Sequence, residues 1–286
     1  MLFYYAYTGH KIGLESVRRG VALLNRLNEK GIETRLLVND FRAGLVARDL
    51  GASAYVTIET VQDIDAIAET GDSIIIDSRE DDHGRLVKFC ADFKHVWRFA
   101  HDKEDYSIHG ERLFEEDCES EVCENALIVD ANFFEAGTKK KERLLFFLGD
   151  ADYDKTVLGN AEFFKAMEME LLLGNYFFVK YEDDLAKIFT TLHEPEEYVD
   201  LMKESTHLVT ASSQAAMEAK ACGTKVIYLE LGQNTLYSNE LLTAYGIDIV
   251  KGFDAEAVKE ALKRVQDRKG RALEIPPFKN LLKEFK

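Results

Sequence analysis

Residues 207–234 read HLVTASSQAAMEAKACGTKVIYLELGQN, and this stretch predicts a strand, a helix and a second strand. The apolar run from residue 207 stops at Ser212, helical spacing follows over residues 214–221, and residues 225–231 are apolar again. Such apolar runs are typical of strands buried on both faces, and a helix between two of them is the unit of a parallel sheet. The stretch therefore predicts the α/β class.

The same alternation of apolar and amphipathic segments runs along the chain and breaks once, at residues 132–143. A chain of 286 residues is long enough for two cores, so the break predicts a domain boundary. We expect two doubly wound, Rossmann-type domains, residues 1–137 and 138–286, facing an interdomain cleft, with ligands outside the carboxyl ends of the strands. Other expected elements are helices at 61–69 and 160–172, strands at 125–132, 176–181 and 187–192, and an acidic solvated stretch at 111–121.

The composition of the chain limits the classes of function that it can have. It carries 52 acidic and 36 basic residues, a formal net charge of −16, and so acidic a surface repels a nucleic-acid backbone. No apolar run approaches the ~20 residues of a membrane span, and no basic segment precedes the first strand, so we expect a cytoplasmic protein without an integral membrane segment. The cysteines lack the spacing of a metal site and are expected to be reduced; they are Cys90, Cys118, Cys123 and Cys222.

The helix that follows Ser212 is the first candidate for ligand binding. Ser212 and Ser213 end the preceding strand, and the free amides and dipole of a helix amino end favour an anion such as a diphosphate. Glu218 lies about one turn into the helix, where a carboxylate can accept hydrogen bonds from ribose hydroxyls. The same residues also suit an ordinary capped helix with a solvated glutamate, and the spacing leaves both interpretations open.

This stretch resembles the carboxyl-terminal nucleotide-binding signature of the GT-B nucleotide-sugar enzymes. The similarity is greatest to the UDP-sugar hydrolases of the pseudaminic acid pathway and their spore-coat polysaccharide relatives. In that comparison Glu218 falls on the family's nucleotide-contacting glutamate. Gln233 and Asn234 lie where the family has an Asn-Gln pair, in reversed order.

Two further segments carry the resemblance. The segment FFLGDADYDKT, residues 146–156, is similar to the family's glycine-and-aspartate loop and contains Gly149 and Asp150. The segment YTGHKIG, residues 7–13, is similar to the Gly-His loop, in which the histidine is the general base. His10 is that histidine, and an imidazole exchanges protons near neutral pH. The alternative is that His10 caps the first helix or has a packing role.

The resemblance implies an enzyme that hydrolyses a UDP-sugar at its anomeric carbon, in surface-polysaccharide or nonulosonic-acid biosynthesis. It implies no metal and no cofactor besides the UDP-sugar substrate. From their places at strand ends and in loops, Gly9, Asp77 and His83 are expected to contact the sugar. The implied nucleotide contacts are Gly149, Asp150, Ser212, Ser213, Glu218, Gln233 and Asn234.

Two departures from the family pattern keep other functions open. Gly13 stands where relatives have an arginine, three residues after the histidine, and a serine replaces the glycine before the signature helix. Arg18 or Arg19 would have to supply the missing charge. A glycosyltransferase of the GT-B class and a nucleotide-sugar-binding protein without catalysis therefore stand beside the hydrolase.

Overall fold

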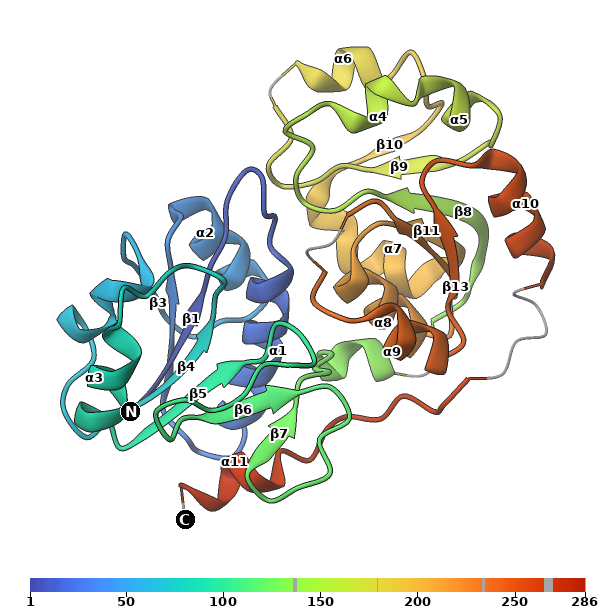
Figure 1. Ribbon diagram of the computed structural model, residues 1–286. Coiled ribbons are helices and arrows are strands. Elements are labelled where there is room, and N and C mark those ends of the chain that lie inside the picture. The colour runs from blue at the N-terminus through green and yellow to red at the C-terminus, as the bar shows by residue number, and fades with distance from the viewer. Residues whose placement is uncertain (136–137, 179, 233–234, 265–269, 286) are drawn as a thin grey trace. The chain divides into compact units, whose positions relative to one another are not determined.

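The chain folds into two compact units, each built on its own parallel sheet (Figure 1). The first unit comprises Met1–Gly9, Ser16–Asp130 and Ile275–Lys286, and the second comprises His10–Glu15 and Ala131–Glu274. The expected boundary lies after residue 137. In this division the boundary lies after Asp130, and Ile275–Lys286 belongs to the first unit. The computed structural model describes residues 1–286 except 136–137, 179, 233–234, 265–269 and 286.

The first unit is a doubly wound sheet of seven strands, in the order β3-β2-β1-β4-β5-β6-β7. All neighbouring strands are parallel, and the order reverses between β1 and β4. The strands are β1 (Leu2–Ala6), β2 (Thr34–Val38), β3 (Tyr55–Thr57), β4 (Ser73–Asp77), β5 (His95–Phe99), β6 (Arg112–Glu115) and β7 (Cys123–Asn125). The helices are α1 (Glu15–Asn28), α2 (Phe41–Asp49), the 3₁₀ helix η1 (Val61–Ala66), α3 (Arg85–Asp92) and α11 (Lys279–Lys283).

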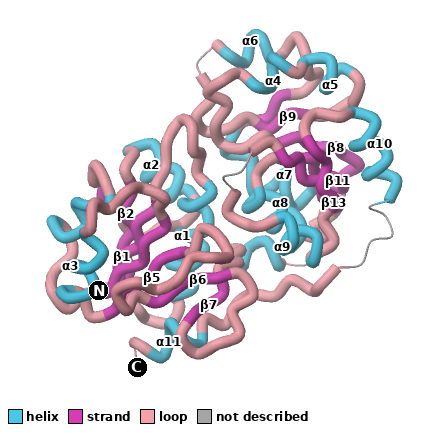
Figure 2. Tube along the Cα trace, in the orientation of Figure 1, coloured by secondary structure: helices cyan, strands magenta, loops and turns pink. Residues whose placement is uncertain are grey.

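Helices α1 and α3 cover opposite faces of this sheet (Figure 2). Neighbouring residues of a strand point to opposite faces, and Tyr4 and Tyr5 of β1 meet different helices. A Cβ on Gly20 of α1 would lie 2.5 Å from Cε1 of Tyr4, so glycine lets the helix approach the ring. Tyr5 shares an apolar cluster with Phe89 of α3. Because both faces are covered, all five residues of β1 are buried.

The second unit is a doubly wound sheet of six parallel strands, in the order β10-β9-β8-β11-β12-β13. The strands are β8 (Lys141–Phe147), β9 (Glu170–Leu172), β10 (Leu192–His193), β11 (Ser205–Thr210), β12 (Lys225–Glu230) and β13 (Asp248–Lys251). The helices are η2 (Ala131–Phe134), α4 (Thr156–Gly159), α5 (Ala161–Lys165), α6 (Tyr181–Leu185), η3 (Pro195–Glu197), α7 (Tyr198–Glu204), α8 (Ser213–Ala221), α9 (Asn239–Ala244) and α10 (Ala255–Arg264). Two doubly wound parallel sheets confirm the predicted fold class.

In the second unit, the elements expected between residues 160 and 192 are wrong in part. The expected helix at 160–172 ends at residue 165, and β9 begins at Glu170. The overlooked signal is a period of two, because Met169, Leu171 and Leu173 all enter the same apolar cluster. The aromatic run at 176–181 is no strand in its described part: Tyr176 and Phe177 lie in a loop, and Tyr181 begins α6. Of the strand expected at 187–192, only Leu192 is in one.

In the first unit, the acidic stretch at 111–121 contains a strand, β6, rather than a wholly solvated face. Leu113 and Phe114 of β6 are buried, and the acidic residues around them masked this short apolar pair. The strand expected at 125–132 ends at Asn125. The segment expected as a helix at 61–69 is the shorter 3₁₀ helix η1.

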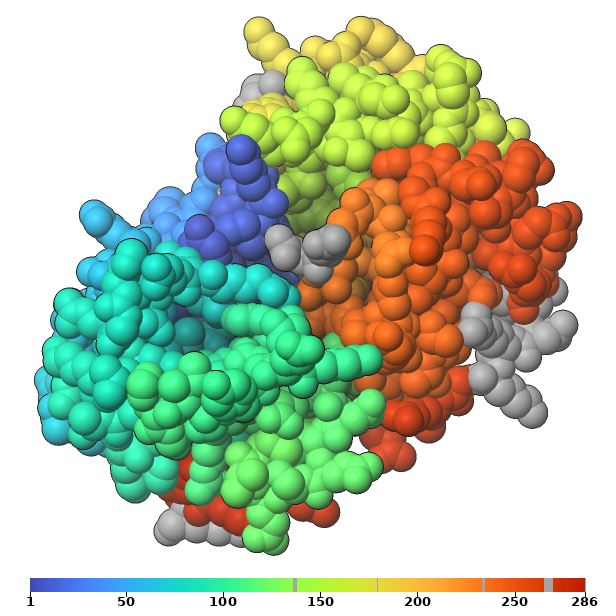
Figure 3. Space-filling view, viewed as in Figure 1, coloured from blue at the N-terminus to red at the C-terminus, as the bar shows by residue number. Residues whose placement is uncertain are grey.

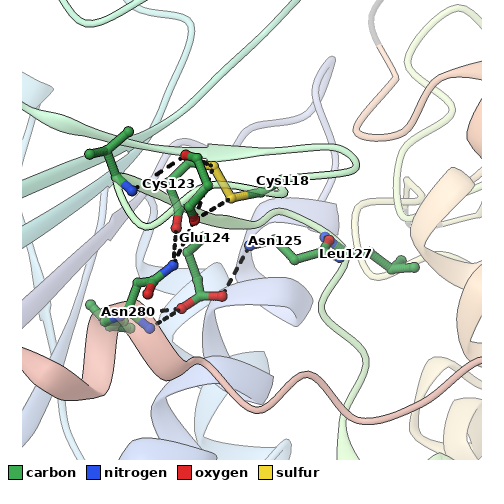
Figure 4. The surroundings of a disulfide bond; sticks show 9 residues. Cys118, Cys123, Glu124, Asn125, Leu127 and Asn280 are labelled. Carbon is green, nitrogen blue, oxygen red and sulfur yellow. Dashed lines mark hydrogen bonds between the residues drawn. A yellow bond between two sulfur atoms is a disulfide. The ribbon is translucent and has the colours of Figure 1, made fainter.

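The carboxyl-terminal helix α11 packs against β7 within the first unit. Asn280 donates hydrogen bonds from Nδ2 to the carbonyl oxygens of Ser120 (3.0 Å) and Cys123 (2.8 Å). Glu124 accepts hydrogen bonds from the backbone N–H groups of Asn280 (3.0 Å) and Leu281 (3.2 Å) (Figure 4). In the space-filling view, the red carboxyl-terminal residues accordingly lie against the green surface around β7 (Figure 3).

Cys118 and Cys123 form a disulfide beside this contact (Figure 4). The expectation that all cysteines are reduced is therefore wrong for this pair, whereas Cys90 and Cys222 are free thiols. A separation of five residues does not fit a metal-binding knuckle, but it does allow a disulfide between the two cysteines. Burial raises the pKa of each free thiol to about 11.

Candidate functional site

The amino end of α8 gathers polar groups of the second unit. Strand β11 ends at Thr210, and Ser212 is the N-cap of α8, with its hydroxyl accepting a hydrogen bond from the N–H of Ala215 (3.1 Å). The hydroxyl of Ser212 donates to the carboxylate of Glu15, and so does the N–H of Gln214 (3.2 Å). This helix end therefore holds an anionic group, as its free amides and dipole favour.

Ser213 ties the start of α8 to the segment that follows β12. Its hydroxyl accepts hydrogen bonds from the N–H groups of Leu236 (3.2 Å) and Tyr237 (3.3 Å). The hydroxyl of Tyr237 in turn donates to Oε1 of Gln214 (2.8 Å). Ser212 and Ser213 are thus brought together at one site, while the expected contacts Gln233 and Asn234 lie outside the described residues.

Glu218 is buried beneath this helix end, with 2% of its surface exposed. The hydroxyl of Tyr198 donates to Oε2 of Glu218, and Nε2 of Gln214 donates to Oε1 (2.8 Å). The structure therefore excludes the solvated glutamate of the alternative interpretation. Contact of Glu218 with a ribose stays a prediction.

The segment His10–Glu15 belongs to the second unit and holds the imidazole against aromatic rings. The ring centroid of His10 is 4.7 Å from that of Tyr176 and 6.4 Å from that of Phe178, with the second pair parallel to within 3°. Among the described residues, Nδ1 of His10 is buried without a hydrogen-bond partner. Ring packing therefore orients this imidazole, whereas most catalytic bases are oriented by a hydrogen-bonded third group.

The turn that carries His10 depends on Gly13 more than on Gly9. Gly13 has a φ of +87°, which residues with a Cβ rarely adopt, whereas Gly9 has a φ of 158°, near extended backbone. A Cβ on Gly13 would lie 4.0 Å from Cβ of Asp150. The left-handed backbone at this position gives a physical reason for a glycine here.

The loop after β8 is tightly packed against the loop after β9. Asp150 is buried; its Oδ1 accepts a hydrogen bond from Nδ2 of Asn175 (2.8 Å), and its carbonyl oxygen accepts one from the N–H of Tyr176 (2.8 Å). A Cβ on Gly174 would lie 2.5 Å from the carbonyl oxygen of Gly149, so glycine is needed for this approach. Gly149 and Asp150 thus lie in a tightly packed loop. Their contact with a nucleotide stays a prediction.

Asp77 and His83 belong to the first unit, where Asp77 takes part in a buried ion pair. Nη2 of Arg19 is 2.6 Å from Oδ1 of Asp77, Nε of Arg19 is 3.1 Å from Oδ2, and the Tyr4 hydroxyl donates to Oδ2 (2.6 Å). Burial, followed by the charge of Asp77, raises the pKa of Tyr4. Arg19 is thus paired with a buried carboxylate of its own unit. The side chain of His83 is 65% exposed.

Sequence reasoning missed several residues of the second unit that shape this site, among them Glu15, Gln214, Tyr176 and Gly174. Glu15 and Gln214 were overlooked because each has an ordinary place in the first turn of its own helix. Tyr176 belongs to an aromatic run that predicts a strand, and Gly174 has no local signal. The close approach of two loops, which requires Gly174, depends on residues that follow β8 and β9, and local patterns do not pair these residues.

Comparison with solved structures shows which known fold the two sheets have. A putative UDP-N-acetylglucosamine 2-epimerase from Listeria monocytogenes matches with a TM-score of 0.58, covering 97% of this chain and 91% of that chain at 11% identity. The chain has the GT-B fold. The calicheamicin glycosyltransferase CalG4 matches with a TM-score of 0.57 at 13% identity, covering 93% of this chain and 90% of that chain.

A third match with this GT-B fold carries a nucleotide. The UDP-GlcNAc 2-epimerase of Methanocaldococcus jannaschii, described in complex with UDP-GlcNAc and UDP, has a TM-score of 0.55 at 13% identity, covering 96% of this chain and 95% of that chain. No protein-family model and no curated protein matches the chain. In the described part of the chain, no helix is long and apolar enough to span a membrane.

Proposed function

We propose that the chain binds a UDP-sugar and releases the sugar by hydrolysis at the anomeric carbon. The observation that carries the proposal is the amino end of α8, where Ser212 Oγ and the Gln214 N–H donate to a carboxylate. Donors that hold one anion are suited to a diphosphate at the same place. The GT-B fold supports this proposal, because proteins with that fold include an epimerase described with UDP bound.

The proposed reaction requires a base for water and support for the leaving group. His10 takes a proton from water as the water oxygen bonds to the anomeric carbon. The bond from that carbon to the β-phosphate oxygen breaks, and UDP leaves with the electron pair. The donors at the amino end of α8 stabilise the negative charge of the departing diphosphate.

Transfer of the sugar to an acceptor is the second candidate. The structural similarity to CalG4, a glycosyltransferase, favours it. Hydrolysis and transfer share the same bond cleavage at the anomeric carbon, and they differ in whether water or another hydroxyl takes the sugar. Binding of the nucleotide sugar without turnover is the third candidate function. The presence of Gly13, where the resemblance leads us to expect an arginine, favours it.

Incubation of the purified protein with a panel of UDP-sugars, without an acceptor, is expected to release UDP in equal amount to free sugar. Release is expected to continue in the presence of EDTA, because the proposed step uses no metal. The measurement is a coupled assay for UDP together with an NMR spectrum of the sugar. UDP release only after an acceptor is added would replace hydrolysis by transfer. A changed sugar that is still joined to UDP would indicate epimerisation and contradict both.

A further inference from the structure

Glu15 occupies the amino end of α8, although it lies 197 residues from Ser212 in the chain. Its Oε1 accepts hydrogen bonds from the hydroxyl of Ser212 and from the N–H of Gln214 (3.2 Å), and its Oε2 lies 3.5 Å from Oγ of Ser213. All three donor residues are buried. A carboxylate bound by a helix amide and neighbouring hydroxyls uses the same kinds of donor that bind phosphate oxygens.

The negative charge of Glu15 also acts on its surroundings. Burial raises the pKa of Tyr228 in β12, and the charges of Glu15 and Glu230 raise it further. A diphosphate placed at the same donors would bring two more negative groups close to Glu15, and like charges at such distances repel. A carboxylate and a diphosphate would therefore compete for these donors.

We propose that Glu15 is a built-in competitor for the diphosphate, so that its carboxylate must leave the amino end of α8 before a nucleotide diphosphate binds. This inference rests on the proposed function, which puts the diphosphate at that helix end. The displaced carboxylate keeps a favourable position, because Glu15 is the acidic residue in the first turn of its own helix, α1. Glu15 thus sets the affinity for the nucleotide without taking part in the reaction.

The test compares UDP binding to the full-length wild type and to Glu15→Gln by isothermal titration calorimetry. Glutamine keeps the size of the side chain but removes the charge, so UDP is expected to bind about tenfold more tightly. Glu29→Gln is the matched control, since Glu29 is an exposed residue just after α1, paired with Arg26, and its replacement changes the net charge equally. The control is expected to bind UDP like the wild type.

Glu15→Ala provides a second variant that removes the carboxylate, and melting curves without UDP establish that each variant is folded. Tighter binding by Glu15→Gln or Glu15→Ala, including binding that the wild type lacks, supports the inference. Equal or weaker binding by the folded variants, with UDP still binding to the wild type, overturns the inference and leaves the proposed function standing. Absence of UDP binding to every variant would overturn the proposed function as well.

Discussion

Replacement of His10 by asparagine is expected to lower the turnover of a UDP-sugar by ~10²–10⁴-fold and to leave UDP affinity unchanged. Asparagine retains a polar side chain at this position but cannot accept a proton from water near neutral pH. UDP affinity is expected to persist because the donors proposed to hold the diphosphate belong to the amino end of α8, whereas His10 packs on Tyr176 and Phe178. Steady-state kinetics and calorimetric titration with UDP measure the two quantities separately.

The matched control for this experiment is His109→Asn, because His109 is exposed and in the other unit. That variant is expected to keep wild-type turnover. Full activity of a folded His10→Asn variant would show that His10 packs the second unit without acting as the base. A loss of UDP affinity equal to the loss of turnover would also contradict the assignment, because a base alone does not hold the nucleotide.

Replacement of Asp77 by alanine is expected to lower the free energy of unfolding by about 3–5 kcal/mol. Asp77 and Arg19 are each about 3% exposed at the side chain, so the variant leaves a guanidinium buried without its carboxylate. The Tyr4 hydroxyl loses its acceptor at the same time. Denaturant unfolding followed by the fluorescence of Trp97, the single tryptophan of the chain and a buried residue of the same unit, measures the change.

Asp81→Ala is the control for Asp77→Ala, because the Asp81 side chain is 75% exposed. A change of at most about 0.5 kcal/mol is expected for that variant, as for other surface substitutions. Equal unfolding midpoints for both variants would contradict a structural role of the buried ion pair. The expected contact of Asp77 with the sugar is a separate prediction, which this experiment does not address.

The layers and the order of the main elements could be predicted because they follow from local patterns. The apolar run of β11, the N-cap Ser212 and the apolar run of β12 are contiguous in the chain and suffice for a strand-helix-strand unit. Short elements were harder to predict. In β6, only Leu113 and Phe114 are buried, and two apolar residues between charged ones do not distinguish a strand from a loop.

Only the part of the candidate site that lies within one continuous segment of the chain could be predicted. Ser212 and Ser213 follow from the cap pattern, and they do lie together at the amino end of α8. Glu15 could not be assigned there, because its partners are about 200 residues away and its local pattern is that of an acidic first turn. The partners of Glu218 were likewise hidden, since its hydrogen bond with Tyr198 joins two helices.

The central claim is that the second unit binds the diphosphate of a nucleotide, and comparison of UDP with uridine tests it most directly. Both ligands carry the same base and ribose, and only UDP carries the diphosphate that the donors at the amino end of α8 would hold. Titration calorimetry in the presence of EDTA is predicted to give saturable one-to-one binding of UDP, at least ~10-fold tighter than uridine. Equal affinity for the two ligands, or no saturation by UDP at millimolar concentration, would contradict the claim.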